Sequence, residues 1–344
     1  MVETVLVTGA SGFVAQHCIV QLLQGGYRVR GTLRSAKRED EVRAAIRNGG
    51  AEDGGLSLVE ADLTKDEGWD EAVAGCAFVL HVASPFPAVQ PEDEDELIRP
   101  ARDGALRVLA AAAKAGVKRT VMTSSIAAVS AGLDKSGGRV FDESDWSDLD
   151  GENVSAYEKS KTIAERAAWE FMDTEAAGDM QLTVINPGAI LGPILTRDTS
   201  TSVEIVRQLM IRAMPACPRI GFPVVDVRDV ASAHIAAMTA PQAAGRRYIC
   251  TLPQVWFTEV GKILDARFGP EGWNIPTGQL PDWVLRVMSI FNPMLRTVTP
   301  ALGVERRYDN SRIRAELNWT AHKVPEMVIA SAESLIEHGV VRRR

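Results

Sequence analysis

The stretch 4-TVLVTGASGFVAQH-17 decides the fold, because it joins an aliphatic strand pattern to a helical one through two glycines. Without a Cβ atom, Gly9 can make the sharp turn and Gly12 lets a pyrophosphate approach the backbone. Ala15, at the third position of the glycine pattern, is small enough for close packing of helix on strand, and the start of the helix attracts phosphate. Rather than a tight turn without a ligand, we predict a dinucleotide-binding turn whose contacting residues are Gly9, Ser11, Gly12, Phe13 and Val14.

Strand and helix patterns alternate on the C-terminal side of this turn. The helical patterns cover residues 13–26, 39–50, 67–76 and 91–116, and a further strand, QLTVINP, follows at 181–187. Such alternation specifies a parallel sheet with helices on both faces. The strand candidates before residue 126 are TVLVTG, YRVRGTL, LSLVEAD, FVLHVAS and RTVMTSS. We therefore predict an α/β fold of the Rossmann type, with a doubly wound parallel sheet.

The chain of 344 residues is longer than one hydrophobic core usually fills. Its rhythm changes after residue 187, where an irregular segment begins, and many prolines and tryptophans follow in 253–303. We predict a dinucleotide-binding domain of residues 1–187 plus 224–252. A smaller C-terminal mixed α/β lobe, residues 188–223 plus 253–344, is expected to bind the substrate.

Composition narrows the partners and the compartment. The net charge of −7 argues against a nucleic-acid-binding protein, because phosphate neutralisation needs a basic surface. The four cysteines form no CxxC pair and have mostly apolar neighbours, which favours reduced thiols and a cytoplasmic protein. Neither a secretory leader nor a run of about 18 apolar residues is present, so we expect no membrane span. The five histidines lack metal-ligand spacing, and we expect no metal.

Basic residues follow the second strand, in 29-VRGTLRSAKRED-40. An acid at this position would bind a ribose hydroxyl, whereas an arginine accommodates a 2′-phosphate. Arg34 has the expected offset, and Lys37 and Arg38 are close, so we predict NADPH/NADP+ rather than NADH, with contacts at Arg34 and Lys37; a solvated basic loop is the alternative. Asp62 ends the third strand beside Leu63, where an acid can meet the adenine amino group or cap a helix.

A tyrosine and a lysine lie one turn apart in 155-SAYEKSKTIAERAAWE-170. Ser155 and Glu158 have capping-box spacing, so the helix is expected to begin at Ser155. Tyr157 and Lys161 then share one face, separated by about 6 Å of rise. Taken alone, such a pair is more often two solvent-exposed side chains with no catalytic role. Two serines that close the fifth strand, at the sheet edge where open α/β folds bind ligands, give it another meaning.

The motifs TGASGFVA, TSS (123–125) and Tyr157-Glu-Lys-Ser-Lys161 together resemble the extended short-chain dehydrogenase/reductase family. The resemblance continues through INPGAILGP (185–193) and DVRDVASAH to DNSRIRAELNW (309–319). Within the family the chain looks like the dihydroflavonol 4-reductase branch. It is most similar there to microbial NADPH-dependent aldehyde and ketone (carbonyl) reductases, through GFVAQH, HVASPF and DVRDVASAH.

This resemblance implies a catalytic site of Ser125, Tyr157 and Lys161, with Ser124 as the fallback for the serine. Tyr157 would give a proton to a carbonyl oxygen while hydride attacks the carbon. A free tyrosine has a pKa of about 10, so work near neutrality needs a shift of roughly three units, which the Lys161 and nicotinamide charges can provide. The family comparison also implies cofactor contacts at Ala83, Tyr157 and Lys161, the last to the nicotinamide ribose. Pro187 and Gly188 look like a turn on the nicotinamide side, with a purely structural turn as the alternative, and substrate contacts are implied at Pro85, Phe86 and Ser124.

Two departures from the family pattern bear on function. Asp103 stands where many members have asparagine, which puts a proton relay at that position in doubt. The motif VSAYEKSK also lacks the aromatic-rich signature of cinnamoyl-CoA reductases. The expected function is reversible reduction of a hydrophobic aldehyde or ketone. The alternatives are a nucleotide-sugar epimerase or dehydratase, a hydroxysteroid dehydrogenase, and a non-catalytic NADP(H) sensor. Alanine-rich helices at 101–116 and 162–177 leave monomer and homodimer open.

Overall fold

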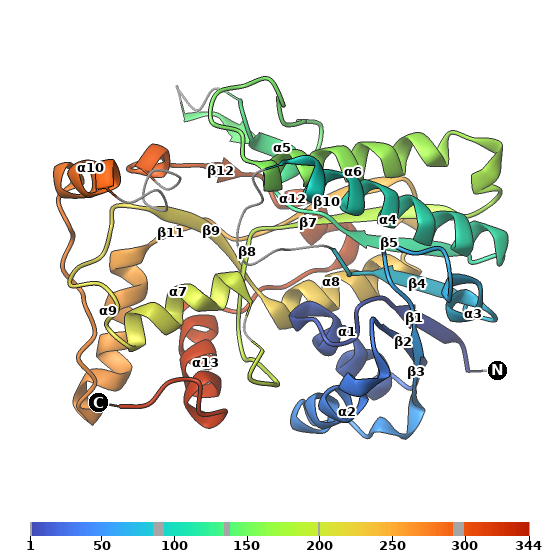
Figure 1. The fold of residues 1–344 in the computed structure, drawn as a ribbon, viewed down its shortest axis with the longest axis horizontal. Coiled ribbons are helices and arrows are strands. Elements are labelled where there is room, and N and C mark those ends of the chain that lie inside the picture. The colour runs from blue at the N-terminus through green and yellow to red at the C-terminus, as the bar shows by residue number, and fades with distance from the viewer. Residues whose placement is uncertain (1, 85–92, 134–137, 199, 292–298, 344) are drawn as a thin grey trace.

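A computed structural model describes residues 2–84, 93–133, 138–198, 200–291 and 299–343 (Figure 1). Two residues that the sequence assigns to the substrate site, Pro85 and Phe86, lie outside these ranges. No helix in the described part of the chain has both the length and the apolar character needed to cross a membrane.

The main sheet has seven strands, all paired in parallel, in the order β10-β7-β5-β4-β1-β2-β3. The chain reverses its direction of winding at β1, as in Rossmann folds, which confirms the predicted doubly wound sheet. The strands are β1 (Thr4–Val7), β2 (Arg28–Leu33), β3 (Leu56–Glu60), β4 (Phe78–His81), β5 (Arg119–Thr123), β7 (Gln181–Pro187) and β10 (Arg246–Cys250).

Helices cover both faces of this sheet, because its strands are apolar on both sides. One face packs against α1 (Phe13–Gln24), α2 (Glu39–Asn48), α8 (Val227–Thr239) and α12 (Ser311–Leu317). The other packs against α3 (Trp69–Val73), α4 (Asp95–Lys114) and α6 (Ala156–Met172). In Figure 1, α4 and α6 lie above the sheet, and α1 and α2 lie below it.

A second hydrophobic core forms the smaller lobe, on the left of Figure 1. Its mixed sheet has the order β11-β9-β8, and its core helices include α7, α9 and α13. The elements are β8 (Ala189–Leu191), α7 (Thr201–Met210), β9 (Gly221–Asp226), β11 (Gln254–Trp256), α9 (Phe257–Phe268), α10 (Asp282–Phe291) and α13 (Val324–Glu337). The segment 188–223, expected to be irregular, thus contains two strands and a helix.

The chain passes between the two lobes at Asp226, which ends β9 and caps α8. β9 pairs within the smaller sheet, whereas α8 packs with α1 on the main one. A helix assigned to the substrate lobe, α12, packs with the main core. The two-domain division stays a prediction, with these elements at its boundary. The remaining elements, α5 (Ala127–Ser130), β6 (Val140–Phe141) and β12 (Arg307–Tyr308), form a small layer near the start of α6.

Candidate active site

The β1–α1 turn has the backbone shape that its glycines were expected to provide. Gly9 has φ +68°, and a Cβ atom there would lie 2.9 Å from Cβ of Ala83. Gly12 caps α1 without a side chain, and the first turn of the helix carries no acidic residue. The first N–H groups of α1 therefore meet no protein anion from their own turn. These features fit the phosphates of a dinucleotide.

The strand ends beside this turn are fastened by Thr8. Its hydroxyl accepts hydrogen bonds from the backbone N–H groups of Val82 and Ala83, each at 3.0 Å, and pairs with Nδ1 of His81 at 3.0 Å. Burial, with a contribution from the charge of Lys161, lowers the pKa of His81 to about 3. His81 is therefore a neutral structural residue that holds the β4 end against the turn, close to Lys161.

The other predicted turn residues, Ser11, Phe13 and Val14, make contacts within the protein. Ser11 accepts a hydrogen bond of 3.1 Å from Arg38, and Phe13 packs edge-on against His17. Val14 is half-buried against the main core. Their contact with a cofactor stays a prediction.

The two cations chosen for the 2′-phosphate, Arg34 and Lys37, are exposed beyond the end of β2. Arg38, which was not chosen, is ion-paired with Glu41 at 2.6 Å and with Asp198 at 2.9 Å, and these bonds raise its pKa. Arg34 and Lys37 are thus accessible cations, whereas Arg38 fastens the loop to the smaller lobe.

Asp62 closes a local turn and does not cap the next helix, because the N-cap residue of α3 is Gly68; the helix-capping alternative is wrong. The Oδ1 atom of Asp62 accepts bonds of 2.9 Å from the backbone N–H and the hydroxyl of Thr64, and the backbone bond is the main reason why its pKa is lowered. Leu63 packs closely against α4: a Cβ atom placed on Gly104 would lie 2.9 Å from the Cβ atom of Leu63. An adenine contact at Asp62 or Leu63 stays a prediction.

The helix that carries the tyrosine and the lysine begins as predicted. Ser155 Oγ accepts a bond from the Glu158 N–H at 3.3 Å, and the Glu158 carboxylate accepts one from the Ser155 N–H at 2.9 Å, which completes the capping box. Tyr157 then lies in the first turn and Lys161 in the next. The ammonium of Lys161 is 6.0 Å from the centre of the Tyr157 ring.

The structure brings the three predicted catalytic side chains together at the carboxyl edge of the sheet. Burial raises the pKa of Tyr157 and a hydrogen bond with Ser125 opposes that rise. Burial lowers the pKa of Lys161 to about 8, while the negative charge of Glu165 acts to raise it. In the protein alone, the pKa of Tyr157 therefore lies above its ordinary value, because the loss of solvation destabilises the phenolate more than the Ser125 hydrogen bond stabilises it.

The two serines after β5 differ in orientation. The Ser124 hydroxyl donates to the buried carboxylate of Glu165 at 2.5 Å. Ser125 Oγ accepts a bond from the Ala127 N–H at 3.1 Å and meets Tyr157. Of the two candidates, the geometry favours Ser125 for the substrate oxygen.

The turn after β7 is tightly packed. The Pro187 carbonyl accepts a bond from the Ile126 N–H at 3.0 Å, and the Gly188 N–H donates to the Cys250 carbonyl at 3.2 Å. A Cβ atom on Gly188 would lie 2.3 Å from Oγ1 of Thr251. This turn reaches the same sheet edge as Ser125, and its contact with the nicotinamide stays a prediction.

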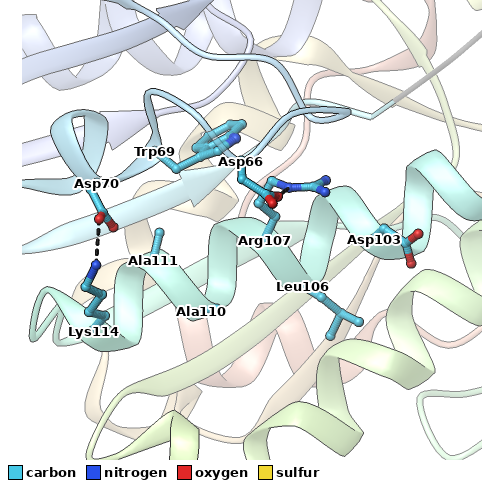
Figure 2. Close-up of a pocket in the computed structure, with 9 residues that line it drawn as sticks. All are labelled: Asp66, Trp69, Asp70, Asp103, Leu106, Arg107, Ala110, Ala111 and Lys114. Atoms are coloured by element: carbon cyan, nitrogen blue, oxygen red, sulfur yellow. Dashed lines mark hydrogen bonds and ion pairs between the residues drawn. The ribbon is translucent and has the colours of Figure 1, made fainter.

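Asp103 does not belong to the site. Its carboxylate pairs with Arg102 at 2.7 Å, and 45% of its side chain is exposed. Figure 2 shows it with Leu106 and Arg107 in an open depression between α3 and α4, on the helix layer. The Asp103 side chain therefore faces Arg102 and solvent, which argues against a proton relay through it.

A strand–glycine turn–helix unit, with a serine, a tyrosine and a lysine at the same sheet edge, defines the class of short-chain dehydrogenases/reductases. Residues 5–250 match the model of the "NAD dependent epimerase/dehydratase family". The chain belongs to this family, whose members are extended short-chain dehydrogenases/reductases, and the predicted family is confirmed.

Known relatives are reductases by name. The chain is 38% identical over 277 residues to cinnamoyl-CoA reductase 1 of Arabidopsis thaliana, covering 80% of this chain and 77% of that one. It is 31% identical over 325 residues to an anthocyanidin reductase of Vitis vinifera, covering 90% and 94%. The yeast methylglyoxal/isovaleraldehyde reductase Gre2, solved with NADPH, superposes with a TM-score of 0.81 at 27% identity, over 98% of this chain and 100% of that one.

Sequence reasoning missed a buried polar cluster beneath these side chains. It consists of Glu165, Asn186 and Arg247, to which Ser124 also bonds. Glu165 has the same helical phase as Tyr157 and Lys161, so spacing alone could have indicated it.

Proposed function

We propose that this enzyme is an NADPH-dependent carbonyl reductase, which reversibly reduces a hydrophobic aldehyde or ketone to the alcohol. The observation that carries the proposal is the meeting of Ser125, Tyr157 and Lys161 beside the glycine turn. This arrangement suits a reaction in which a carbonyl oxygen gains negative charge and then a proton.

Each side chain has a defined part in this reaction. NADPH, when bound, supplies the hydride. Ser125 donates a hydrogen bond to the carbonyl oxygen, which takes the electron pair of the carbonyl π bond as the new C–H bond forms at carbon. Tyr157 gives that oxygen its phenolic proton and is reprotonated from solvent. Lys161, nine-tenths buried, places its positive charge beside the phenolate that forms.

The choice of NADPH is supported by the exposed Arg34 and Lys37 at the end of β2. Their charges are available to the 2′-phosphate, which NADH lacks. Gre2, solved with NADPH, is similar over nearly the whole chain.

The substrate class is supported by what the relatives' names have in common, a reduction. The chain lacks the aromatic-rich tyrosine motif of cinnamoyl-CoA reductases, so we propose small hydrophobic carbonyl compounds rather than CoA thioesters. The four cysteines are free and buried, which supports our proposal of a cytoplasmic protein. A monomer and a homodimer both agree with the structure.

The test follows nicotinamide absorbance while the purified protein meets NADPH or NADH and a panel of aldehydes, ketones and α-ketoesters. We expect carbonyl-dependent oxidation of NADPH, and its loss by about 10²- to 10⁴-fold in Tyr157→Phe. Cofactor binding should persist in the variant. If NADPH binds and no member of the panel is reduced, the proposal fails. A nucleotide sugar, a steroid or a sensing role is then tested instead.

A further inference from the structure

A carboxylate with no exposed surface lies beneath the proposed catalytic side chains. Glu165 follows Lys161 by four residues and Tyr157 by eight, so all three share one face of α6. Its side chain is fully buried in the layer between α6 and the sheet. A charged group is rarely kept in such a place without several partners.

The described hydrogen-bond partners of the Glu165 carboxylate are all donors. Oε2 accepts from the Ser124 hydroxyl at 2.5 Å and from the Asn186 amide at 2.8 Å. Oε1 accepts from the Arg247 guanidinium and from the Trp169 indole. An ionised carboxylate, which only accepts, matches this set of donors.

These donors come from the strand ends that form the site. Ser124 precedes Ser125 at the end of β5, and Asn186 precedes Pro187 at the end of β7. The Asn186 amide also donates to the Ser125 carbonyl at 3.1 Å. The cluster therefore holds the backbone on either side of the Ser125 hydroxyl against the helix that carries Tyr157 and Lys161.

Arg247 completes the cluster from the edge strand β10. Its guanidinium also donates to the Glu143 and Asp145 carbonyls, and it stacks 3.8 Å above the Trp146 ring. This arginine is therefore held in place independently of Glu165. It presents a fixed positive charge to the carboxylate.

The negative charge of Glu165 also stabilises the protonated form of Lys161. Burial lowers the pKa of Lys161 to about 8, and the negative charge of Glu165 opposes that fall. Among the described residues, the other titratable and charged groups that face Tyr157, Lys161 and Glu165 are Arg247 from β10, His81 from β4, which is neutral near pH 7, and Glu158 on α6. Loss of the Glu165 charge would leave Lys161 more often neutral at pH 7, and Tyr157 would lose its cationic neighbour.

We propose that Glu165 is a positioning residue for this active site. It fixes Ser125 against α6 and keeps the ammonium form of Lys161 beside Tyr157. The proposal rests on the proposed reductase function. Glu165 acts through its neighbours and touches neither substrate nor cofactor.

The experiment compares Glu165→Gln with wild type by two readouts. The first is the pH profile of kcat for alcohol oxidation, the direction that needs the Tyr157 phenolate. The second is ¹³C NMR of the tyrosine phenol carbons with NADP+ bound, where Tyr157 is assigned by its loss in Tyr157→Phe. We expect the apparent pKa of Tyr157 to rise by about one unit and kcat at neutral pH to fall about tenfold, with KM changed less.

Asp229→Asn is the matched control. Asp229 is also a buried carboxylate, which accepts bonds from the backbone N–H and the ring of His322 at 2.7 and 2.6 Å in another part of the fold. This variant should lower Tm without moving the pKa of Tyr157. If Glu165→Gln behaves in the same way, its role is structural only and the proposal is overturned.

A second variant covers the case in which Glu165→Gln fails to fold. Glu165→Gln with Arg247→Met removes both buried charges, so neither is left unpaired. It should show the same rise in the pKa of Tyr157, and an unchanged pKa would again overturn the proposal. If wild type reduces no carbonyl compound, the proposed function fails, while the NMR titration still decides whether Glu165 controls Tyr157.

Discussion

At the scale of single residues, burial disfavours the charged forms of the two ionisable side chains of the site, Tyr157 and Lys161. The pKa of Tyr157 is raised and that of Lys161 is lowered to about 8, because both side chains are desolvated. Each shift disfavours a charged form: the phenolate that Tyr157 becomes when it gives up its proton, and the ammonium of Lys161. The compensating groups are Ser125 for the tyrosine and Glu165 for the lysine, with the nicotinamide charge as a further source.

Arg34 should decide the preference for NADPH. Arg34→Ala should weaken NADPH binding about tenfold to hundredfold and leave NADH almost unchanged, because a hydrogen bond to a charged group contributes about 1.5–3 kcal/mol. Fluorescence titration with both cofactors measures this. Arg28→Ala, an exposed arginine at the opposite end of β2, is the control and should change neither affinity. Equal losses for NADPH and NADH in Arg34→Ala would remove its role at the 2′-phosphate.

Alanine substitutions at Ser124 and Ser125 should lower kcat by different factors. Ser125→Ala should lower kcat about 10²- to 10³-fold, since it removes a donor to the developing oxyanion. Ser124→Ala should cost less, because its hydroxyl points to Glu165. Steady-state kinetics of carbonyl reduction compares them at saturating NADPH. A larger loss in Ser124→Ala would transfer the role to that residue.

At the scale of elements, short sequence motifs predicted the helix starts and turns that depend only on neighbouring residues. The capping box of Ser155 and Glu158 marked the start of α6, and the glycines at 9 and 12 marked the first turn. β7 spans Gln181–Pro187, the same residues as the strand predicted from the sequence. These features need only neighbours in sequence, so a single sequence contains them.

What the sequence did not reveal depends on distant contacts. The helix α7 was missed within a segment read as irregular, although Ser200 caps it and its buried residues recur at Val203, Val206 and Leu209. Helical spacing could have indicated Glu165 itself, but three of its partners are 21, 41 and 82 residues away, at Asn186, Ser124 and Arg247. No local pattern identifies these three partners, since folding alone brings them to Glu165.

At the scale of the whole molecule, buried histidines join the layers. His17 bonds to the Pro193 carbonyl at 2.8 Å, across the two lobes, and His234 bonds to Thr123 at 2.6 Å, between α8 and β5. Burial lowers the pKa of both to about 4, against an ordinary value of 6.5, and that of His81 to about 3. All three are neutral in the folded protein at neutral pH.

Stability should therefore fall on acidification, starting near pH 6.5. Below that pH the unfolded chain binds protons that the folded protein does not, so the free energy of unfolding decreases until the pH nears about 4. Each pKa unit is worth about 1.4 kcal/mol, which makes the total loss on the order of several kcal/mol. Urea denaturation at a series of pH values measures it. His17→Gln, which can still donate to Pro193, should flatten the curve, and an unchanged stability between pH 7 and about pH 5 would contradict the argument.

The central claim, hydride transfer to a carbonyl carbon with a proton from Tyr157, has one direct measurement. The enzyme is given an aldehyde or ketone reduced in the panel and NADPH deuterated at both C4 positions of the nicotinamide, and the alcohol is analysed by mass spectrometry. The result predicted here is one deuterium on the former carbonyl carbon of every product molecule, with the labelled alcohol formed about 10²- to 10⁴-fold more slowly by Tyr157→Phe. An alcohol formed without the label, or a labelled alcohol formed as fast by the variant as by wild type, would contradict it.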